Sequence, residues 1–430
     1  MKTPVWTWLP GVSDPVLAGQ LAMIAGQGKL WYEQAYMDMA HARALDPIQL
    51  RFSRKNTGIP LLQNGGLPGV VADAMPAGYG ADRLHAQHDR TLTPLELLEF
   101  GPADGVGAIE VCHDIERKLA WQPHTLDELK TYIQELEETT PASRAIRRLL
   151  DDATTSAGGE RPKLTLQHQG KLWLAKLQDR GDAPHLPARE YIVMRMASEL
   201  DLQVPEVRLE THAGREVFLI ERFDRVGDPL HLQRHLFASA HTVLGLSANT
   251  LPGDARRSYL VLADQMRRWI SDPQDCQQDL QELWRRMAYN ALVGNGDDHP
   301  RNHGLLHDGT GWRLSKVFDI TPLPTFNRIL AMSVTADGSQ ECSAHNLLSA
   351  APHLGMSLRD AAAWLGDAAA YVAQSWEQLL QDQGVPVLRI AQFRPAFAFA
   401  TELAENPELL EQALTSVEQQ TRRKGQRNKR

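Results

Sequence analysis

The stretch Asn295-Gly296-Asp297-Asp298-His299-Pro300-Arg301-Asn302, followed by Phe318-Asp319, decides the fold of this chain. In phosphotransferases with an Asp-x4-Asn motif, the carboxylate orients the attacking hydroxyl, and the Asn and a later Asp hold magnesium. Those residues here are Asp297, Asn302 and Asp319. Because Mg²⁺ prefers oxygen ligands and phosphate, one amide, one carboxylate and a nucleotide suffice. The stretch predicts an ATP site, although Asn-Gly and Asp clusters are also typical of polar turns.

Two upstream segments have the pattern of a phosphate-binding loop and of a strand that carries a cation. Residues 156–163 contain Gly158 and Gly159 and lead into a predicted strand. Glycine amides approach phosphate oxygens closely, because no side chain intervenes. The next predicted strand, residues 171–177, carries Lys176 in an apolar stretch. A lysine there either protects a sheet edge or binds the α- and β-phosphates, and the downstream motif favours phosphate.

The segments that follow have the order of a kinase small lobe and the start of a large lobe. A helix is predicted over 187–197, and strands over 204–209 and 217–220. The charged run 221–225 then has the position of a linker between lobes, although an ordinary charged strand end has the same pattern. Apolar residues at helical spacing over 280–291 predict a buried helix that leads into the Asp-x4-Asn motif.

With these parts in order, the whole chain resembles the HipA family, the serine/threonine kinase toxins of bacterial toxin–antitoxin systems. The family signature Asp-x-His-x-Lys-Asn is present at 297–302, with Arg301 in place of the usual Lys. The family hinge Glu-Arg-Phe-Asp-Arg occurs unchanged at 221–225, and Phe318-Asp319 matches the magnesium-binding position. The resemblance implies an α+β, bilobal, protein-kinase-like fold with a small β-rich N-terminal subdomain and a helical C-terminal lobe.

The resemblance also implies a role for each matching residue. It makes Asp297 catalytic, assigns magnesium to Asn302 and Asp319, and makes His299 a structural member of the loop that forms anchoring hydrogen bonds. It further implies that main-chain groups of Glu221 and Phe223 hold adenine, and that Asp224 faces the ribose. The expected ATP-binding residues are Ser156, Gly158, Gly159, Lys163, Lys176, Glu221, Phe223 and Asp224.

Ser156 has a second expected role. Some family members phosphorylate a serine in the Gly-rich loop and thereby inactivate themselves, and Ser156 has the equivalent position. Phosphate there would bring negative charge to a loop that must accept the phosphates of ATP. The alternative is that residues 154–156 are a polar linker, and the sequence favours neither interpretation.

The family resemblance implies partners as well as an activity. The expected acceptor is a protein, with aminoacyl-tRNA synthetases as the family precedent, and the expected binding partner is a HipB-like helix-turn-helix antitoxin. A net charge of −8 argues against strong direct DNA binding, so any DNA contact is expected through that partner. Two alternatives stay open: a pseudokinase or corepressor that only binds, and a kinase for a small molecule.

Composition is that of a water-soluble protein with several domains. The 430 residues are 43% hydrophobic and 23% charged, which allows two or three domains with substantial cores. Three widely spaced cysteines predict neither a disulfide framework nor a zinc site: Cys112, Cys276 and Cys342. No apolar run approaches the roughly 18 residues of a membrane span. We therefore expect a cytoplasmic protein with no membrane partner.

The expected domains follow from these segments. The sequence Thr125-Leu126-Asp127-Glu128 predicts a capping box for a helix that connects the N-terminal third to the kinase region. Residues 421–430 contain six basic side chains and no apolar ones, which favours disorder. The predicted boundaries are 1–110 for the N-terminal subdomain, 111–150 for a helical connector, 151–225 for the small lobe, 226–415 for the large lobe and 416–430 for a basic, disordered tail.

Overall fold

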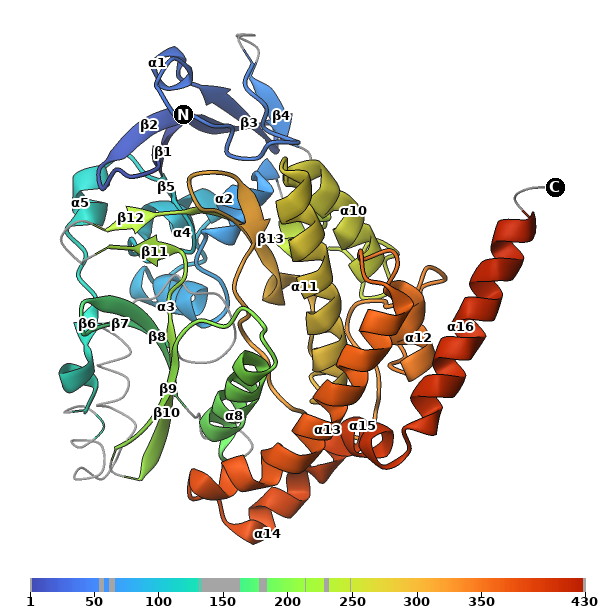
Figure 1. Cartoon of the computed structure of the whole chain (residues 1–430). Helices are drawn as coiled ribbons and strands as arrows, with labels where there is room; N and C mark the ends of the chain where they lie inside the picture. The colour runs from blue at the N-terminus through green and yellow to red at the C-terminus, as the bar shows by residue number, and fades with distance from the viewer. Residues whose placement is uncertain are drawn as a thin grey trace. The chain divides into compact units, whose positions relative to one another are not determined.

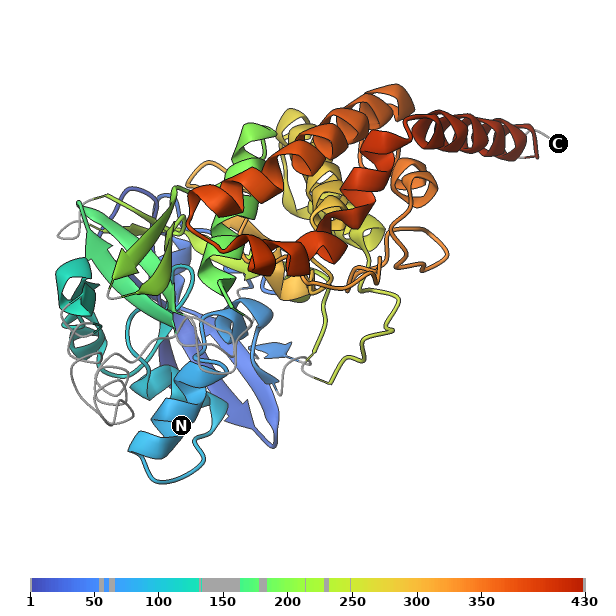
Figure 2. The same ribbon diagram turned by 90° about the horizontal axis from the view of Figure 1, so that it is seen from below.

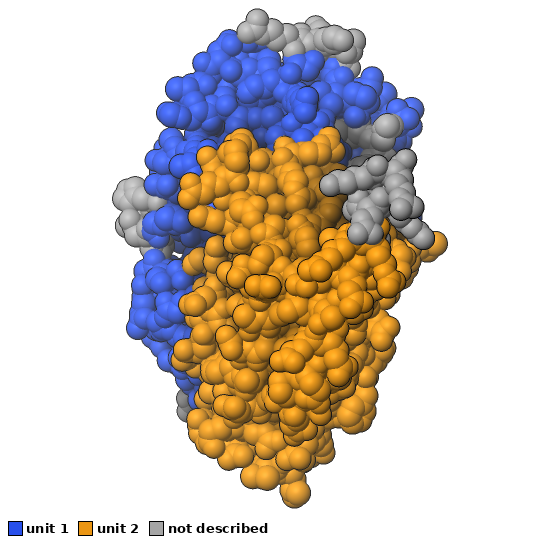
Figure 3. Space-filling model, turned by 45° about the vertical axis from the view of Figure 1, so that its right-hand side comes forward, with its two compact units in different colours: residues 1–182, 205–249, 304–315 blue, residues 183–204, 250–303, 316–430 orange. Residues whose placement is uncertain are grey.

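The computed structural model describes residues 2–53, 58–61, 66–130, 133, 163–177, 184–212, 214–227, 232–247 and 249–427. The chain forms two compact units, shown in different colours in Figure 3. Unit 1 contains residues 1–182, 205–249 and 304–315, and unit 2 contains residues 183–204, 250–303 and 316–430. Each unit contains three separate ranges of the chain, whereas each predicted domain is one continuous range. The two divisions are therefore of different kinds, and the predicted domain boundaries stay predictions.

Unit 1 begins with an antiparallel five-stranded sheet in the order β4-β3-β2-β1-β5 (Figure 1). The β2–β3 hairpin turns at Ala25 and Gly26, which both have positive φ, as a tight two-residue hairpin requires. This sheet confirms the expected β-rich N-terminal subdomain. Its strands are β1 (Thr3–Trp8), β2 (Pro15–Ile24), β3 (Gln27–Tyr32), β4 (Ile59–Leu61) and β5 (Ile109–Val111).

A second five-stranded sheet of unit 1 has the order β6-β7-β8-β10-β9. The strands are β6 (His124–Thr125), β7 (Lys163–His168), β8 (Lys171–Leu177), β9 (Val207–His212) and β10 (Arg215–Glu221). The four strands predicted for the small lobe are therefore present, and β6 adds a parallel neighbour to β7.

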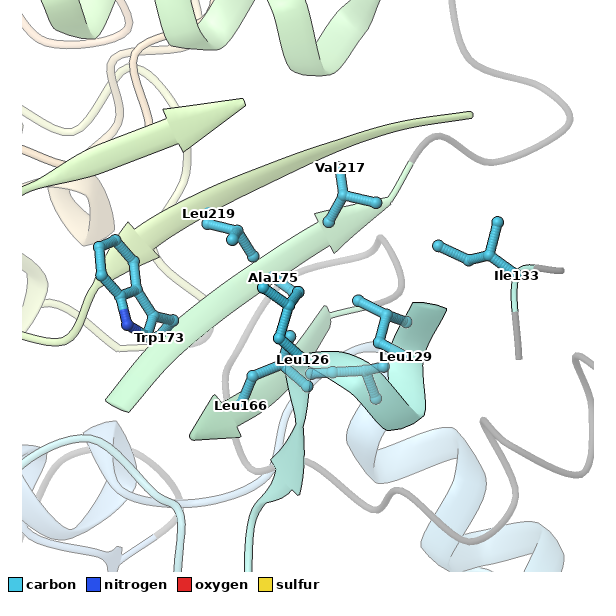
Figure 4. Close-up of a cluster of buried hydrophobic side chains, with 9 residues drawn as sticks. Leu126, Leu129, Ile133, Leu166, Trp173, Ala175, Val217 and Leu219 are labelled. Carbon is cyan, nitrogen blue, oxygen red and sulfur yellow. The ribbon is translucent and has the colours of Figure 1, made fainter. Parts of the chain in front are cut away.

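The predicted capping box is present, and apolar residues in and after it pack against this second sheet. The backbone N–H of Glu128 donates to Thr125 Oγ1 at 3.2 Å, and the Glu128 carboxylate accepts from the Thr125 N–H at 2.6 Å. The cap directs the following residues onto the sheet, where they form one buried cluster (Figure 4). The cluster contains Leu126, Leu129, Ile133, Leu164, Leu166, Trp173, Ala175, Val217 and Leu219. Each fully buried leucine contributes about 1.5–3 kcal/mol.

The described part of unit 1 also contains two small sheets and several short helices. The two strands that follow residue 303 form a hairpin, which pairs with an earlier strand in the order β13-β14-β15. These strands are β13 (Leu236–Ser239), β14 (Gly304–His307) and β15 (Trp312–Leu314); β11 (Arg225–Val226) pairs with β12 (Gln233–Arg234). The helices are α1 (Gln34–Met37), α2 (Gly69–Asp73), α3 (Tyr79–Gln87), α4 (Pro94–Phe100), α5 (Ile115–Leu119) and α9 (Ala240–Val243).

Unit 2 is helical in its described part. Its elements are α8 (Leu186–Glu199), α10 (Tyr259–Trp269), α11 (Pro273–Leu292), η2 (Pro300–Asn302), α12 (Ala344–Ala350), α13 (Leu358–Asp382), α14 (Val387–Ile390), η3 (Ala391–Phe393), α15 (Arg394–Glu405) and α16 (Glu408–Arg427). The predicted C-terminal helical bundle is confirmed, and α13 lies beside α15 (Figures 1 and 2), where Trp376 and Phe397 stack with centroids 4.4 Å apart. No helix in the described residues is both long and apolar enough to cross a membrane.

The predicted disordered tail is wrong for residues 416–427, because α16 continues through Arg427. Leu410, Ala413 and Val417 are buried and anchor the first half of this helix. Glu418 and Arg422 then form an i,i+4 pair at 3.9 Å. Basic side chains near a helix C-terminus generally interact favourably with the helix dipole, so Arg422 and Arg423 are compatible with helix here.

Candidate active site

The predicted catalytic loop begins where α11 ends, at a glycine that no other residue can replace without strain. Gly294 has φ +65°, and a Cβ atom there would lie 2.5 Å from the carbonyl oxygen of Ala396. The turn therefore requires both the left-handed conformation and the missing side chain. It redirects the chain from the buried helix into the sequence that carries Asp297.

Asn295 ties the start of this loop to the segment that follows the predicted magnesium-binding Asp319. Its side chain is 1% exposed, and its Nδ2 donates to Asn290 Oδ1 at 3.1 Å. Its Oδ1 accepts from the backbone N–H of Thr321 at 3.3 Å. One buried amide therefore links α11, the catalytic loop and the residues after Asp319.

The two adjacent carboxylates of the motif lie in opposite environments. Asp297 is exposed, whereas Asp298 is 1% exposed and its Oδ1 lies 2.6 Å from Nε2 of His303. The ring of His303 meets the ring of Tyr259 edge-on, with centroids 5.4 Å apart. Burial therefore gives Asp298 a structural role and leaves Asp297 accessible to a substrate.

A short hydrogen-bonded turn sets the position of Asn302 relative to Asp297. The N–H of His299 donates to the Asp297 carbonyl at 2.9 Å, and the N–H of Asn302 donates to the His299 carbonyl at 2.9 Å. The Nδ2 atom of Asn302 also donates to the Asp297 carbonyl, at 3.0 Å. Since the amide nitrogen is used within the turn, the side-chain oxygen is the atom suited to a hard cation.

The expected anchoring role of the His299 side chain needs correction. Its Nδ1 atom is buried and has no hydrogen-bond partner among the described residues, and the hydrogen bonds described for His299 come from its backbone. His303 is the histidine whose ring anchors the loop, through Asp298. Sequence reasoning missed His303, because its only signal was an Asp five residues upstream.

Asp319 has a backbone conformation that is unfavourable for a residue with a side chain. Its φ is +62°, in the left-handed region. The residues that follow are held firmly, since Arg189 of α8 donates to the Pro322 carbonyl and its guanidinium lies 4.5 Å from the ring centroid of Phe393. Such strain is retained where surrounding contacts impose it, often at functional residues.

Two lysines of unit 1 face each other across neighbouring strands. Lys163 begins β7 and is directly opposite Lys176 of β8 in the antiparallel register. Lys163 is 9% exposed, and Nζ of Lys176 lies 5.8 Å from the ring centroid of Phe218. Two cations at directly opposed positions are suited to an anion such as phosphate. The predicted loop residues Ser156, Gly158 and Gly159 lie outside the described residues.

The predicted hinge is fixed to the second sheet by backbone hydrogen bonds. The N–H of Glu221 donates to the Glu206 carbonyl at 2.9 Å, and the N–H of Arg222 donates to the Leu172 carbonyl at 2.9 Å. The side chain of Phe223 packs against Phe237, with ring centroids 6.2 Å apart. The main chain that is expected to meet adenine is therefore held in one position.

The expectation that Asp224 faces the ribose does not fit its surroundings. The side chain is 3% exposed, and Oδ2 accepts from the Gly107 N–H at 2.8 Å and from Arg225 at 2.6 Å. Arg222 donates to both carboxylate oxygens. Burial alone would raise the pKa of Asp224, but the two arginines hold that pKa well below its usual range. Asp224 is a buried ion-pair residue that ties the hinge to the N-terminal subdomain.

A cavity of about 240 Å³ in unit 1 belongs to the same ion-pair network. Lys118, Arg222, Arg225 and Arg234 line it, and none of the predicted nucleotide-binding residues is among the described residues around it. Lys118 and Arg234 both contact Glu110, at 3.4 and 2.8 Å. The cations are matched by acidic partners within the fold, which indicates a structural role.

Comparison with known proteins agrees with this arrangement. The model of the HipA-like C-terminal domain matches residues 155–376, more than half of the chain. The serine/threonine-protein kinase toxin HipA of Shewanella oneidensis is 27% identical over 209 residues, covering 42% of this chain and 46% of that protein. The Y4mE protein of Sinorhizobium fredii is 27% identical over 142 residues, which are 32% of each chain. The chain spans less than half the length of these curated relatives.

The match to a solved structure covers more of this chain than the matches to the two relatives by sequence. A solved structure from Shewanella oneidensis MR-1, of HipA with HipB and its operator DNA, matches 96% of this chain and 99% of that chain. The TM-score is 0.65 at 19% sequence identity, so the likeness concerns the fold. The expected α+β, kinase-like fold is thus confirmed. The match of the HipA-like C-terminal domain over residues 155–376 shows that the chain belongs to the HipA-like family.

Proposed function

We propose that this chain is an ATP- and Mg²⁺-dependent serine/threonine protein kinase that transfers the γ-phosphoryl group to a protein hydroxyl. The observation that carries the proposal is the contrast between exposed Asp297 and buried Asp298 on one loop. A phosphotransferase needs one accessible carboxylate at the acceptor and a rigid loop behind it. Membership of a family with a kinase toxin among its relatives supports the same activity.

In this proposal Asp297 orients the acceptor hydroxyl and takes its proton as the oxygen attacks phosphorus. The Asp298–His303 pair would hold the loop in position, which lowers the energy needed for reorganisation during the reaction. Asn302, through Oδ1, and Asp319 would hold the magnesium ion. This ion would neutralise charge on the phosphate oxygens. Its proposed ligands are one amide and one carboxylate, the hard oxygen donors that it prefers.

The nucleotide would be held by residues of unit 1. Lys163 and Lys176 would supply two positive charges for phosphate, and the backbone amides of Gly158 and Gly159 would complete the phosphate contacts. Main-chain groups of Glu221 and Phe223 would recognise adenine. Asp224 is left out of this set, because its carboxylate is occupied by Arg222 and Arg225.

The proposed partners follow from the family. An aminoacyl-tRNA synthetase is the proposed class of acceptor, and Ser156 is a proposed site of autophosphorylation. A HipB-like antitoxin is the proposed binding partner, since the structural relative forms a complex with HipB and operator DNA. The net charge of −8 supports a DNA contact that is made through this partner. A cytoplasmic location is proposed with these partners.

The test is phosphotransfer from γ-labelled ATP in the presence of Mg²⁺ and a bacterial lysate, followed by mass-spectrometric mapping of the labelled sites. Wild-type protein should label a protein acceptor on serine or threonine, and Asp297→Ala should not. Nucleotide binding without protein label would instead favour a pseudokinase that acts as a corepressor. Label in a small molecule would favour a small-molecule kinase.

A further inference from the structure

We propose that the exposed tip of residues 323–329 is the docking surface for the polypeptide that accepts the phosphoryl group, with Phe326 as its anchor. The inference rests on the proposed protein kinase activity and specifies how that site selects its acceptor. The occupant is an extended segment of the acceptor protein that carries an apolar side chain within a few residues of its serine or threonine.

The first observation is the exposure of a large aromatic side chain. Phe326 is 75% exposed, and Ile329 on the same segment is 42% exposed. In the described part of unit 2, the other large apolar side chains exposed by more than two thirds are aliphatic: Leu251, Val387 and Leu388. Exposed aromatic residues supply much of the binding energy at protein interfaces, because they bury a large area with few rotatable bonds.

The second observation is the position of this segment next to the catalytic loop. The N–H of Leu323 donates to the Gly294 carbonyl at 3.0 Å. A Cβ atom on Gly296 would lie 3.3 Å from the Ile329 carbonyl oxygen and 3.6 Å from Leu323 Cδ1. Both ends of the segment therefore contact the loop immediately before Asp297, and Gly296 leaves the space that this close approach needs.

The third observation is that the base of the segment is held while its tip projects. Arg328 forms an ion pair with Glu402, and its guanidinium lies 5.3 Å from the ring centroid of Phe399. The Arg328 carbonyl also accepts from the Cys342 N–H at 2.8 Å. An anchor whose base is already ordered loses less conformational entropy when a partner binds.

These positions favour a polypeptide acceptor over a small one. The acceptor hydroxyl must reach exposed Asp297, so a chain bound there passes the Gly294–Gly296 turn and the segment beside it. A small molecule is normally held in an enclosed, largely apolar pocket, whereas Phe326 is a projecting side chain. A projecting aromatic suits an apolar side chain of a protein that is bound across the surface.

The experiment compares Phe326→Ala with Leu251→Ala, which removes a side chain of similar exposure, 74%, elsewhere on unit 2. The probe is bacterial lysate protein with γ-labelled ATP and Mg²⁺, and the readouts are the initial rate of protein labelling and the KM for ATP. Phe326→Ala should lower the labelling rate about tenfold at limiting lysate, the loss typical of an interface anchor, with an unchanged KM for ATP. Leu251→Ala should label like wild type.

Wild-type labelling rates in Phe326→Ala, or equal losses in the two variants, would overturn the docking surface and leave the kinase activity intact. A wild-type protein that labels nothing would overturn the proposed function itself, and this inference with it. A photo-crosslinking phenylalanine analogue at position 326 gives a second readout. It should capture the labelled acceptor, whereas the same analogue at position 251 should not. Capture from position 251 and not from position 326 would contradict the proposal.

Discussion

Oδ1 of Asp298 lies 2.6 Å from Nε2 of His303, and both side chains are buried beneath the loop that carries Asp297. The second carboxylate oxygen, Oδ2, is buried and has no hydrogen-bond partner among the described residues. The histidine is thus the principal partner that keeps this carboxylate inside the protein. We therefore expect this contact, between two residues with no proposed part in the chemistry, to hold the proposed catalytic loop in place.

Replacing His303 by alanine should destabilise unit 2 strongly. The change leaves the buried Asp298 carboxyl group without its hydrogen-bond partner, which typically costs about 1–3 kcal/mol, and more for a charged group. Urea denaturation followed by fluorescence measures the loss. His303→Gln keeps a hydrogen-bond donor and should lose clearly less. Equal losses for the two variants would show that packing, and not the contact to Asp298, matters at this position.

The Asp319→Asn variant should separate magnesium binding from folding. Asparagine tolerates the left-handed conformation that Asp319 adopts, so the unfolding free energy should hardly change. The loss of charge should raise the Mg²⁺ concentration for half-maximal phosphotransfer about tenfold, the equivalent of about 1.4 kcal/mol. Nucleotide binding in the presence of EDTA should stay at the wild-type level. An unchanged Mg²⁺ requirement would remove Asp319 from the proposed metal site.

Lys176→Met should weaken ATP binding, because it removes one of the two cations that face each other on β7 and β8. We expect a rise of about tenfold in the Kd for ATP, measured by isothermal titration calorimetry. Lys171→Met is the matched control on the same strand, since Lys171 is bonded to Glu206 at 2.9 Å and to Glu221 at 3.1 Å. A larger loss of affinity in the control would contradict the proposed role of Lys176.

His307 should make unit 1 less stable in acid. Burial, with a smaller contribution from nearby Arg43, lowers the pKa of His307 from 6.5 to about 4. Between these pH values the unfolded chain binds more protons than the folded one, so stability falls as the pH drops from 6.5 towards 4. Urea midpoints at pH 7.5, 5.5 and 4.5 should fall in that order. His307→Gln should reduce this slope, and an unchanged slope would assign it to other groups.

Much of the fold was predictable because its signals are local. Neighbouring residues alone define the strand pattern of β7 and β8, the apolar face of α11 and the cap at Thr125. The proposed catalytic residues Asp297 and Asn302 also come from a local pattern, since they lie within one short stretch. Local patterns therefore predicted the elements, and the chemistry of the loop stays a proposal.

The remaining features depend on contacts that sequence periodicity does not report. Asp224 accepts from the Gly107 N–H, 117 residues away, a contact that the family hinge motif does not indicate. Asp297 and Asp298 are chemically identical, and only burial distinguishes them. The end of α16 was predicted as disordered from its charge, whereas its buried first half extends the helix.

The rate of γ-phosphoryl transfer by Asp297→Asn at saturating ATP and Mg²⁺ tests the proposed catalytic role of Asp297 most directly. We predict ATP affinity and an unfolding midpoint close to those of wild type, because Asp297 is exposed, and a transfer rate lower by about 10²–10⁴-fold, the range for loss of a positioned general base. Transfer by this variant at the wild-type rate would contradict the assignment of Asp297 as the catalytic carboxylate.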